Sequence, residues 1–150
     1  MVQCPDSLVW ELVKSNNSFM KKVNGRTKRS GTASFSVEKG NLRSTSSFRN
    51  SGLANSKAID IAATSDNRAS LSTKTGKAAT APKKAMASSG LNKSFRRVEK
   101  TIMSQTANVN YRADLKDDAL AKFSIIYRAN RAAKGVKKGV PVKKGRGKSA

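Results

Sequence analysis

Clusters of lysine and arginine are the residues of this sequence most able to do chemistry, and the chemistry that they suit is phosphate binding. The chain of 150 residues has a formal net charge of +22 and contains no histidine. A charge magnitude of roughly 2–8 is enough to keep a small domain soluble. Like charges held in one small body repel one another, and such an excess is typical of proteins that bind nucleic acid. We therefore expect a polyanionic partner.

Three clusters concentrate the candidate phosphate-binding cations. They are Arg26, Lys28 and Arg29; Arg96, Arg97 and Lys100; and Lys137, Lys138, Lys143, Lys144 and Arg146. Glycines at 25 and 31 flank the first cluster and would let the backbone approach a phosphate closely. The segment 128–150 contains nine cations and no anion, so we expect it to be disordered alone and to become ordered on RNA. A nuclear-import signal is the alternative interpretation of this tail, and the two uses can coexist.

The remaining reactive side chains do not predict an active site. Cys4 is the only cysteine of the sequence, which excludes an intrachain disulfide or a cysteine-rich zinc site and suits a reducing compartment. Asp117 and Asp118 are adjacent, so on a helix their carboxylates diverge by about 100°. Neither a P-loop nor a dinucleotide-binding glycine pattern is present. We expect no enzyme activity, no cofactor, no metal site and no small-molecule substrate.

The apolar stretches are too short to predict a membrane partner. The run Leu8-Val9-Trp10, for example, is broken within three residues. A membrane-spanning helix needs roughly 20 apolar residues, and a secretory signal needs about 7–15. We expect neither in this sequence.

The elements that position the cations are predicted to form an α+β domain with a small antiparallel sheet, a short N-terminal helix and two C-terminal helices. We expect the first helix over 7–14 and strands over 18–23 and 32–37, followed by weaker strands around residues 59–61 and 69–74. Alternation over 32–37 indicates that one face is buried, namely Ala33, Phe35 and Val37. The stretch 76–90, inside a polar region of about 63–90, is low in complexity and reads as a loop without core residues.

From Ser94 the apolar period changes to that of a helix. The predicted apolar stripe contains Phe95, Val98, Ile102 and Val109, with Arg96, Arg97 and Lys100 grouped on the opposite face. A second helix is expected to begin at Asp114, which would cap it, and to end before Gly135. Residues 1–127 are thus predicted to form one domain, with 128–150 as a basic extension.

Aromatic side chains offer a second means of binding nucleic acid, because bases stack on them. Phe19, Phe35, Phe95 and Phe123 fall on the predicted apolar faces, so we expect them in the core. Phe48 and Tyr111 instead lie in irregular segments, beside Arg49 and Arg112. These two rings are therefore the stacking candidates.

Three segments, Leu8–Phe19, Asn41–Lys57 and Tyr111–Leu115, resemble the eukaryotic large-subunit ribosomal protein family numbered twenty-eight in order and spacing. The most specific is the S-F-R-x-x-G-L core at 47–53, followed by a lysine at position 57. The resemblance covers about residues 6–62 and 91–134. A related domain occurs in nucleolar assembly factors of the Mak-sixteen type.

The resemblance implies a structural constituent of the large subunit of the cytoplasmic ribosome, assembled in the nucleolus. It would bind ribosomal RNA, including expansion segments, next to neighbouring ribosomal proteins, and would support translation without catalysis. Two sets of residues match the family, the loop laid against RNA and the corner between the two helices: Ser47, Phe48, Arg49, Gly52, Leu53 and Lys57; and Tyr111, Arg112, Asp114 and Leu115. The chain departs from the family at Ala113, where proline is usual, and over 69–75, where the family strand is rich in valine.

Two alternative functions stay open on the sequence, a nucleolar assembly factor and an architectural protein of chromatin or DNA. Composition does not separate the assembly factor from a ribosomal protein. The DNA alternative would use the C-terminal helix pair as a helix-turn-helix. However, the basic helix is the first of the pair, and Asp117 and Asp118 at the start of the second would repel a duplex.

Overall fold

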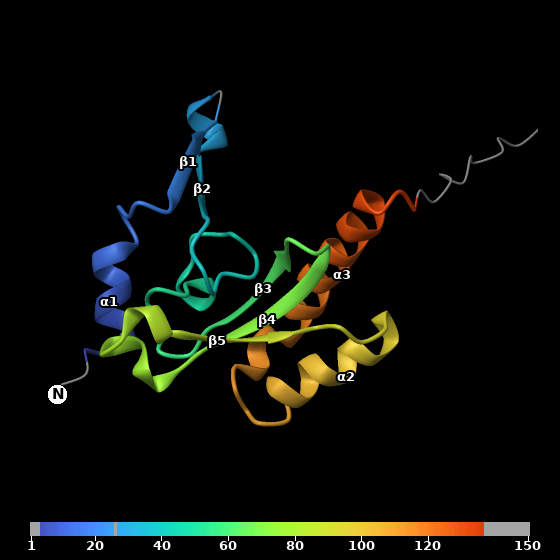
Figure 1. Cartoon of the computed structure of the whole chain (residues 1–150). Helices are drawn as coiled ribbons and strands as arrows, with labels where there is room; N and C mark the ends of the chain where they lie inside the picture. Colours follow the sequence, from blue (N-terminus) through green and yellow to red (C-terminus); the bar gives the residue numbers. More distant parts are fainter. Residues whose placement is uncertain (1–3, 26, 137–150) are drawn as a thin grey trace, which may run out of the picture.

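The part of the chain that the structure describes combines three helices with two small antiparallel sheets, which confirms the predicted α+β class. A computed structural model describes residues 4–25 and 27–136. The elements are α1 (Asp6–Val13), β1 (Met20–Asn24), β2 (Thr32–Ser36), β3 (Ile59–Thr64), β4 (Arg68–Lys74), β5 (Met86–Gly90), α2 (Phe95–Gln105) and α3 (Lys116–Ala133) (Figure 1). The N-terminal helix and the two C-terminal helices lie where the sequence predicts them.

The strands form two sheets, and the expectation of a single sheet was wrong. β1 and β2 pair as a hairpin, with Met20 opposite Ser36 and Asn24 opposite Thr32. β3, β4 and β5 form a separate antiparallel sheet in that order. Figure 1 shows the hairpin rising away from the three-stranded sheet and the C-terminal helices.

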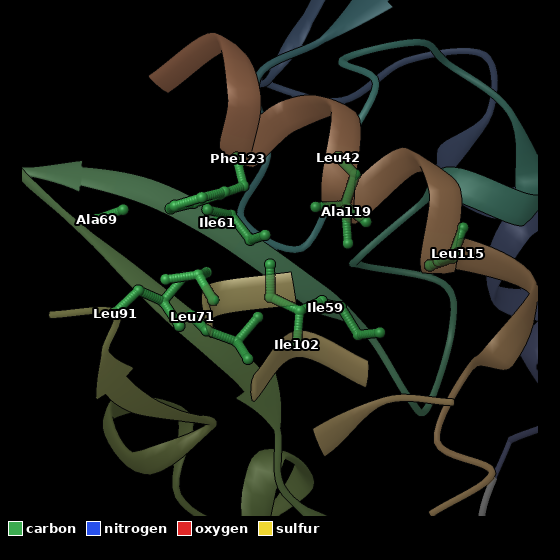
Figure 2. Close-up of a cluster of buried hydrophobic side chains, with 11 residues drawn as sticks. Leu42, Ile59, Ile61, Ala69, Leu71, Leu91, Ile102, Leu115, Ala119 and Phe123 are labelled. Atoms are coloured by element: carbon green, nitrogen blue, oxygen red, sulfur yellow. The ribbon is translucent and has the colours of Figure 1, made fainter. Parts of the chain in front are cut away.

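The hydrophobic core lies between the three-stranded sheet and helices α2 and α3. Ile59, Ile61 and Leu71 are fully buried on the sheet. The helices bury their apolar stripes against them, through Val98, Ile102, Leu115, Ala119 and Phe123 (Figure 2). Removing such side chains from water is the main stabilising term for a domain of this size. Val98 and Ile102 of the predicted apolar stripe of α2 are thus confirmed as core residues.

The hairpin exposes the face that alternation predicted to be buried. Phe35 is 43% exposed, and Phe19 and Val37 are also exposed, whereas Ser36 on the opposite face is buried. The Ser36 amide donates a hydrogen bond to the carbonyl of Ser44, in the loop that follows β2. A period of two separates two faces but does not say which of them meets the core. Phe19 and Phe35 are consequently not core residues.

The stretch 76–90, predicted as a loop, contains β5, whereas β4 lies where the sequence predicts a weaker strand. β5 pairs with β4, where the hydroxyls of Ser72 and Ser88 lie 2.8 Å apart on an exposed position of the sheet. Backbone hydrogen bonds with β4 stabilise β5, although most side chains of β5 are small. None of the described side chains from 76 to 90 is buried, in agreement with the expectation of no core there.

The helix ends also differ from the sequence-based boundaries. α2 stops at Gln105, so Val109 lies outside it and is exposed, as is Phe95 at its start. α3 begins after a 3-10 turn that contains Asp114, which forms no side-chain cap. It runs to Ala133, so residues 128–133 of the expected extension belong to it, and it stops before Gly135 as the sequence predicts. The amide of Gly135 bonds to the carbonyl of Ala132 and its φ is +79°, a left-handed helix stop that favours glycine.

Candidate nucleic-acid interface

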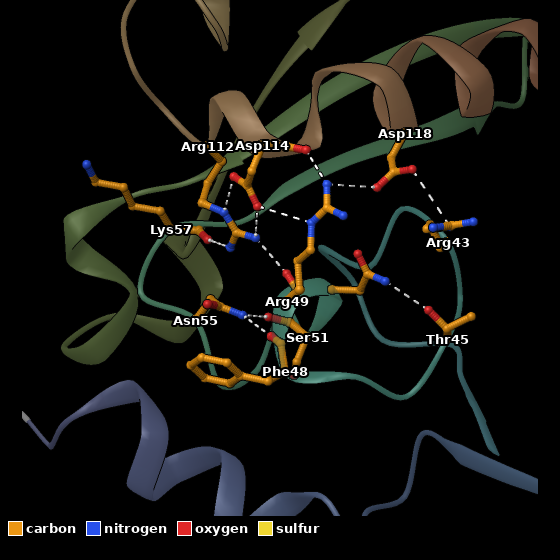
Figure 3. A network of polar contacts seen from close by, with 11 residues as sticks. Arg43, Thr45, Phe48, Arg49, Ser51, Asn55, Lys57, Arg112, Asp114 and Asp118 are labelled. Carbon is orange, nitrogen blue, oxygen red and sulfur yellow. Dashed lines mark hydrogen bonds and ion pairs between the residues drawn. The ribbon is translucent and has the colours of Figure 1, made fainter.

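Two segments more than sixty residues apart in sequence meet in one polar network (Figure 3). Arg49, in the 47–57 loop, donates to the carbonyl of Asp114, and its guanidinium lies 3.5 Å from the Asp114 carboxylate and 3.7 Å from that of Asp118. Arg112 lies 2.9 Å from the same Asp114 carboxylate. It also donates to the carbonyls of Lys57 at 2.9 Å and Arg49 at 2.6 Å. The two arginines thus tie the loop to the corner before α3.

The network accounts for the electrostatics of Asp114. The hydrogen bond from Arg112 is the main cause that holds the pKa of this carboxyl below its ordinary value, and Arg49 adds to the effect. The Arg112 side chain is only 15% exposed, whereas that of Arg49 is 53% exposed. Arg112 therefore directs its donors into the fold. Arg49 keeps part of its guanidinium open to a phosphate.

The 47–57 loop is packed closely against the chain because of Gly52. A Cβ atom placed there would lie 2.1 Å from the Lys39 carbonyl oxygen and 2.8 Å from the Gly40 Cα. The Lys74 ammonium fastens the loop from β4, with hydrogen bonds to the carbonyls of Gly52 at 2.9 Å and Asn55 at 2.7 Å. Burial lowers the pKa of Lys74. The glycine of the most specific motif is thus explained by the crossing of two backbone segments.

The two stacking candidates have different environments. Tyr111 packs against the core, and its hydroxyl donates to the Lys74 carbonyl at 2.5 Å. Burial raises the pKa of this hydroxyl. The Lys57 ammonium lies 5.7 Å from the centre of the Tyr111 ring, so the ring supports a cation that is itself exposed. Phe48 is 41% exposed and lies beside Trp10, with 6.1 Å between ring centres. Phe48 is therefore the more accessible platform.

The structure divides the cations of α2 between two hollows. Arg97 and Lys100 line one of them together with Lys93, which precedes the helix. Arg96 lines a different hollow, between α2 and α3, that also contains Glu99. All three predicted cations are exposed. Positions 96, 97 and 100 span about 100° around the helix, with Lys100 between the two arginines, so the three cations share one side of α2 and Arg96 lies at its edge toward α3.

The hairpin and the tail carry the other predicted cations. Arg29 is exposed in the turn between β1 and β2, and Lys28 belongs to the same turn. Arg26 lies outside the described residues, as do the tail cations Lys137, Lys138, Lys143, Lys144 and Arg146. Gly31 closes the turn with φ of +63°, a left-handed conformation that favours glycine. Ser47, the remaining predicted contact, is half-buried at the start of the 47–57 loop.

Sequence reasoning missed a second group of cations. Arg68, Lys93, Arg131 and Lys134 line a hollow of about 280 Å³ at one end of the three-stranded sheet. They come from the start of β4, the connection between β5 and α2, the last turn of α3 and the residue that follows it. Only the tertiary fold brings them together, so no local pattern in the sequence could have found them.

The described part of the chain has no helix that is both long and apolar enough to cross a bilayer. Within residues 4–25 and 27–136, no three His, Cys, Asp or Glu side chains gather in a way that would hold a metal ion.

Comparison with known proteins gives one family. A sequence model of the Ribosomal L28e protein family matches residues 8–129. The large ribosomal subunit protein eL28 of Caenorhabditis elegans is 43% identical over 58 residues, which are 39% of this chain and 42% of that protein. The protein of the same name from Dictyostelium discoideum is 40% identical over 72 residues, 48% of each chain. The chain thus matches less than half the length of either relative.

Proposed function

The chain belongs to the Ribosomal L28e protein family, and on this premise we propose that it is a structural constituent of the large subunit of the eukaryotic cytoplasmic ribosome. The family is one of ribosomal proteins and not of enzymes, which confirms the expectation of no enzyme activity. Both relatives carry the name of a large-subunit protein, and this supports the assignment.

We propose that the protein binds ribosomal RNA by neutralising phosphates over several surfaces. The observation that carries this proposal is the net charge of +22 together with the placement of exposed cations on separate elements. The described cations proposed to meet phosphate are Arg29, Arg49, Lys57, Arg96, Arg97 and Lys100. Tyr111 and Arg112 act through the loop that they position, and Phe48 offers its exposed ring to a base. Contacts of this kind hold a protein in register without reading sequence.

The proposed partners are large-subunit RNA, including expansion segments, and neighbouring ribosomal proteins. Large apolar side chains remain exposed on α1 and on the hairpin, including Leu8, Leu12 and Val23. A two-stranded hairpin is at best marginally stable in water by itself. Contact with a neighbour in the ribosome would cover these side chains and stabilise the hairpin. Contact with RNA alone would not account for their apolar character.

Sedimentation of a cell lysate through a sucrose gradient in high salt tests the proposed function. We expect the chain in the large-subunit fraction and in polysomes, because many phosphate contacts act together. Recovery only in nuclear pre-ribosomal particles would identify an assembly factor and overturn the proposal. Recovery in chromatin, with none in ribosomal fractions, would favour the DNA alternative. One feature counts against the DNA alternative: Asp117 and Asp118 lie in the first turn of α3, the helix that would enter the groove, and would repel a duplex.

A further inference from the structure

A hollow of about 280 Å³ lies where the β3–β4 turn, the β5–α2 connection and the C-terminal half of α3 meet. Its apolar lining includes Ala69, Leu91 and Phe123, which Figure 2 shows at one end of the hydrophobic cluster. The volume is slightly below the roughly 300 Å³ at which typical ligand sites start. It therefore suits one small planar group better than a longer segment.

The described residues that line this hollow include no carboxylate and four cations: Arg68, Lys93, Arg131 and Lys134. Among the contacts of the described residues, none of these four side chains forms an ion pair or a hydrogen bond. The acid nearest in sequence, Asp66, lies on the adjoining turn with Ser65 as its hydrogen-bond partner. Such an arrangement repels other cations and attracts a group that carries phosphate.

Three asparagines and one aromatic ring complete the lining. Asn67, Asn92 and Asn130 come from the three different elements, and Tyr127 comes from α3. Asn67 sits at φ of +53° at the end of the β3–β4 turn, a left-handed conformation that asparagine tolerates better than most residues. The guanidinium carbon of Arg131 lies 6.0 Å from the centre of the Tyr127 ring. Amides read base edges by hydrogen bonding, and tyrosine and arginine planes stack on bases.

We propose that this hollow binds a single unstacked nucleotide of RNA. Its base enters against Tyr127 and Arg131, the asparagine amides bond to its edge, and the flanking phosphates lie on Arg68, Lys93 and Lys134. The choice of RNA rests on the proposed function, because the same chemistry would also receive a nucleotide of DNA. The hollow adjoins the α2 cations, since Lys93 also lines the hollow of Arg97 and Lys100. An RNA strand that leaves the nucleotide site therefore meets further positive charge.

Binding of short RNAs to the full chain, followed by fluorescence anisotropy at fixed salt, tests the inference. One RNA is a perfect duplex, and the others are the same duplex with one unpaired A, C, G or U. We expect at least one unpaired nucleotide to improve affinity about tenfold, the order of effect of a good contact to a base edge. The double variant Asn92→Ala/Asn130→Ala should lose this preference and bind the duplex as before, because no charge changes. Asn16→Ala, an exposed asparagine near α1, is the matched control and should keep the preference.

A second measurement places the nucleotide. With 4-thiouridine as the unpaired residue, photo-crosslinks should fall on the residues that line the hollow, Tyr127 above all. Equal affinity for all the RNAs, or crosslinks confined to the hairpin and the Arg97 face of α2, would overturn the inference and leave general RNA binding intact. Failure of the chain to bind any of these RNAs at low salt would instead count against the proposed function itself.

Discussion

The substitution Gly52→Ala tests the account of the 47–57 loop. A methyl group there would lie 2.1 Å from the Lys39 carbonyl oxygen and 2.8 Å from the Gly40 Cα. Both obstacles are backbone, so neither can move aside as the end of a long side chain could. Overpacking of this kind costs about 1–3 kcal/mol and occasionally more. The loop must shift away from Lys39, which also lengthens the bonds from Lys74 to Gly52 and Asn55.

Urea unfolding followed by far-ultraviolet circular dichroism measures this cost. The fluorescence of Trp10, the only tryptophan, follows the same loop, since its ring lies beside Phe48. We expect a lower midpoint in both signals. Gly76→Ala is the control, because a Cβ atom there meets nothing within 4 Å, and it should leave the midpoint unchanged or raise it slightly. An unchanged midpoint for Gly52→Ala would refute the explanation of this glycine.

Three further predictions follow from the charged groups. Arg112→Gln should destabilise the fold by about 1–3 kcal/mol in urea unfolding, because it removes the donor to two backbone carbonyls, those of Lys57 and Arg49. The Asp114 carboxylate is 45% exposed, so the loss of its ion pair adds little. Arg49→Gln, at a side chain that is 53% exposed, should cost under about 1 kcal/mol; equal costs would contradict the assigned roles. In the folded chain the pKa of Asp114 lies below its ordinary value of 3.8. At pH values between the folded and the ordinary pKa, the unfolded chain therefore binds more protons than the folded chain. The free energy of unfolding should fall as the pH drops through this interval. Asp114→Asn should flatten that acid-side slope, and a slope unchanged in the variant would exclude the effect. If about 6–10 phosphates are contacted, RNA affinity measured by filter binding should fall roughly 10³–10⁵-fold between 50 and 200 mM salt, and a shallow dependence would contradict binding through phosphates.

The core was predictable because helical periodicity fixes both an element and its buried face. Val98 and Ile102 of α2 and Phe123 of α3 are buried as predicted, whereas Phe95, at the exposed start of α2, is not. The hairpin shows the limit of the same reasoning. Alternation identified β2 correctly, but Phe35 is exposed, since the two-stranded ribbon does not join the sheet that carries the core.

The interface was less predictable than the fold because its parts come together through tertiary contacts. Arg49 and Arg112 were singled out as separate RNA contacts, and nothing in their local sequence shows that both bind Asp114. The cations around the 280 Å³ hollow were not predicted as a group, because only tertiary contacts bring together Arg68 and Arg131 from distant segments. Net charge, by contrast, is a property of the whole chain and needs no structure to be interpreted.

The measurement that tests the central claim most directly is the copy number of this chain in actively translating ribosomes. Polysomes washed in high salt would be analysed by quantitative mass spectrometry, with other large-subunit proteins as internal standards. A structural constituent predicts about one copy for each large subunit, retained after the wash. A small fraction of a copy, or loss of the chain from polysomes while it remains in precursor particles, would contradict the account.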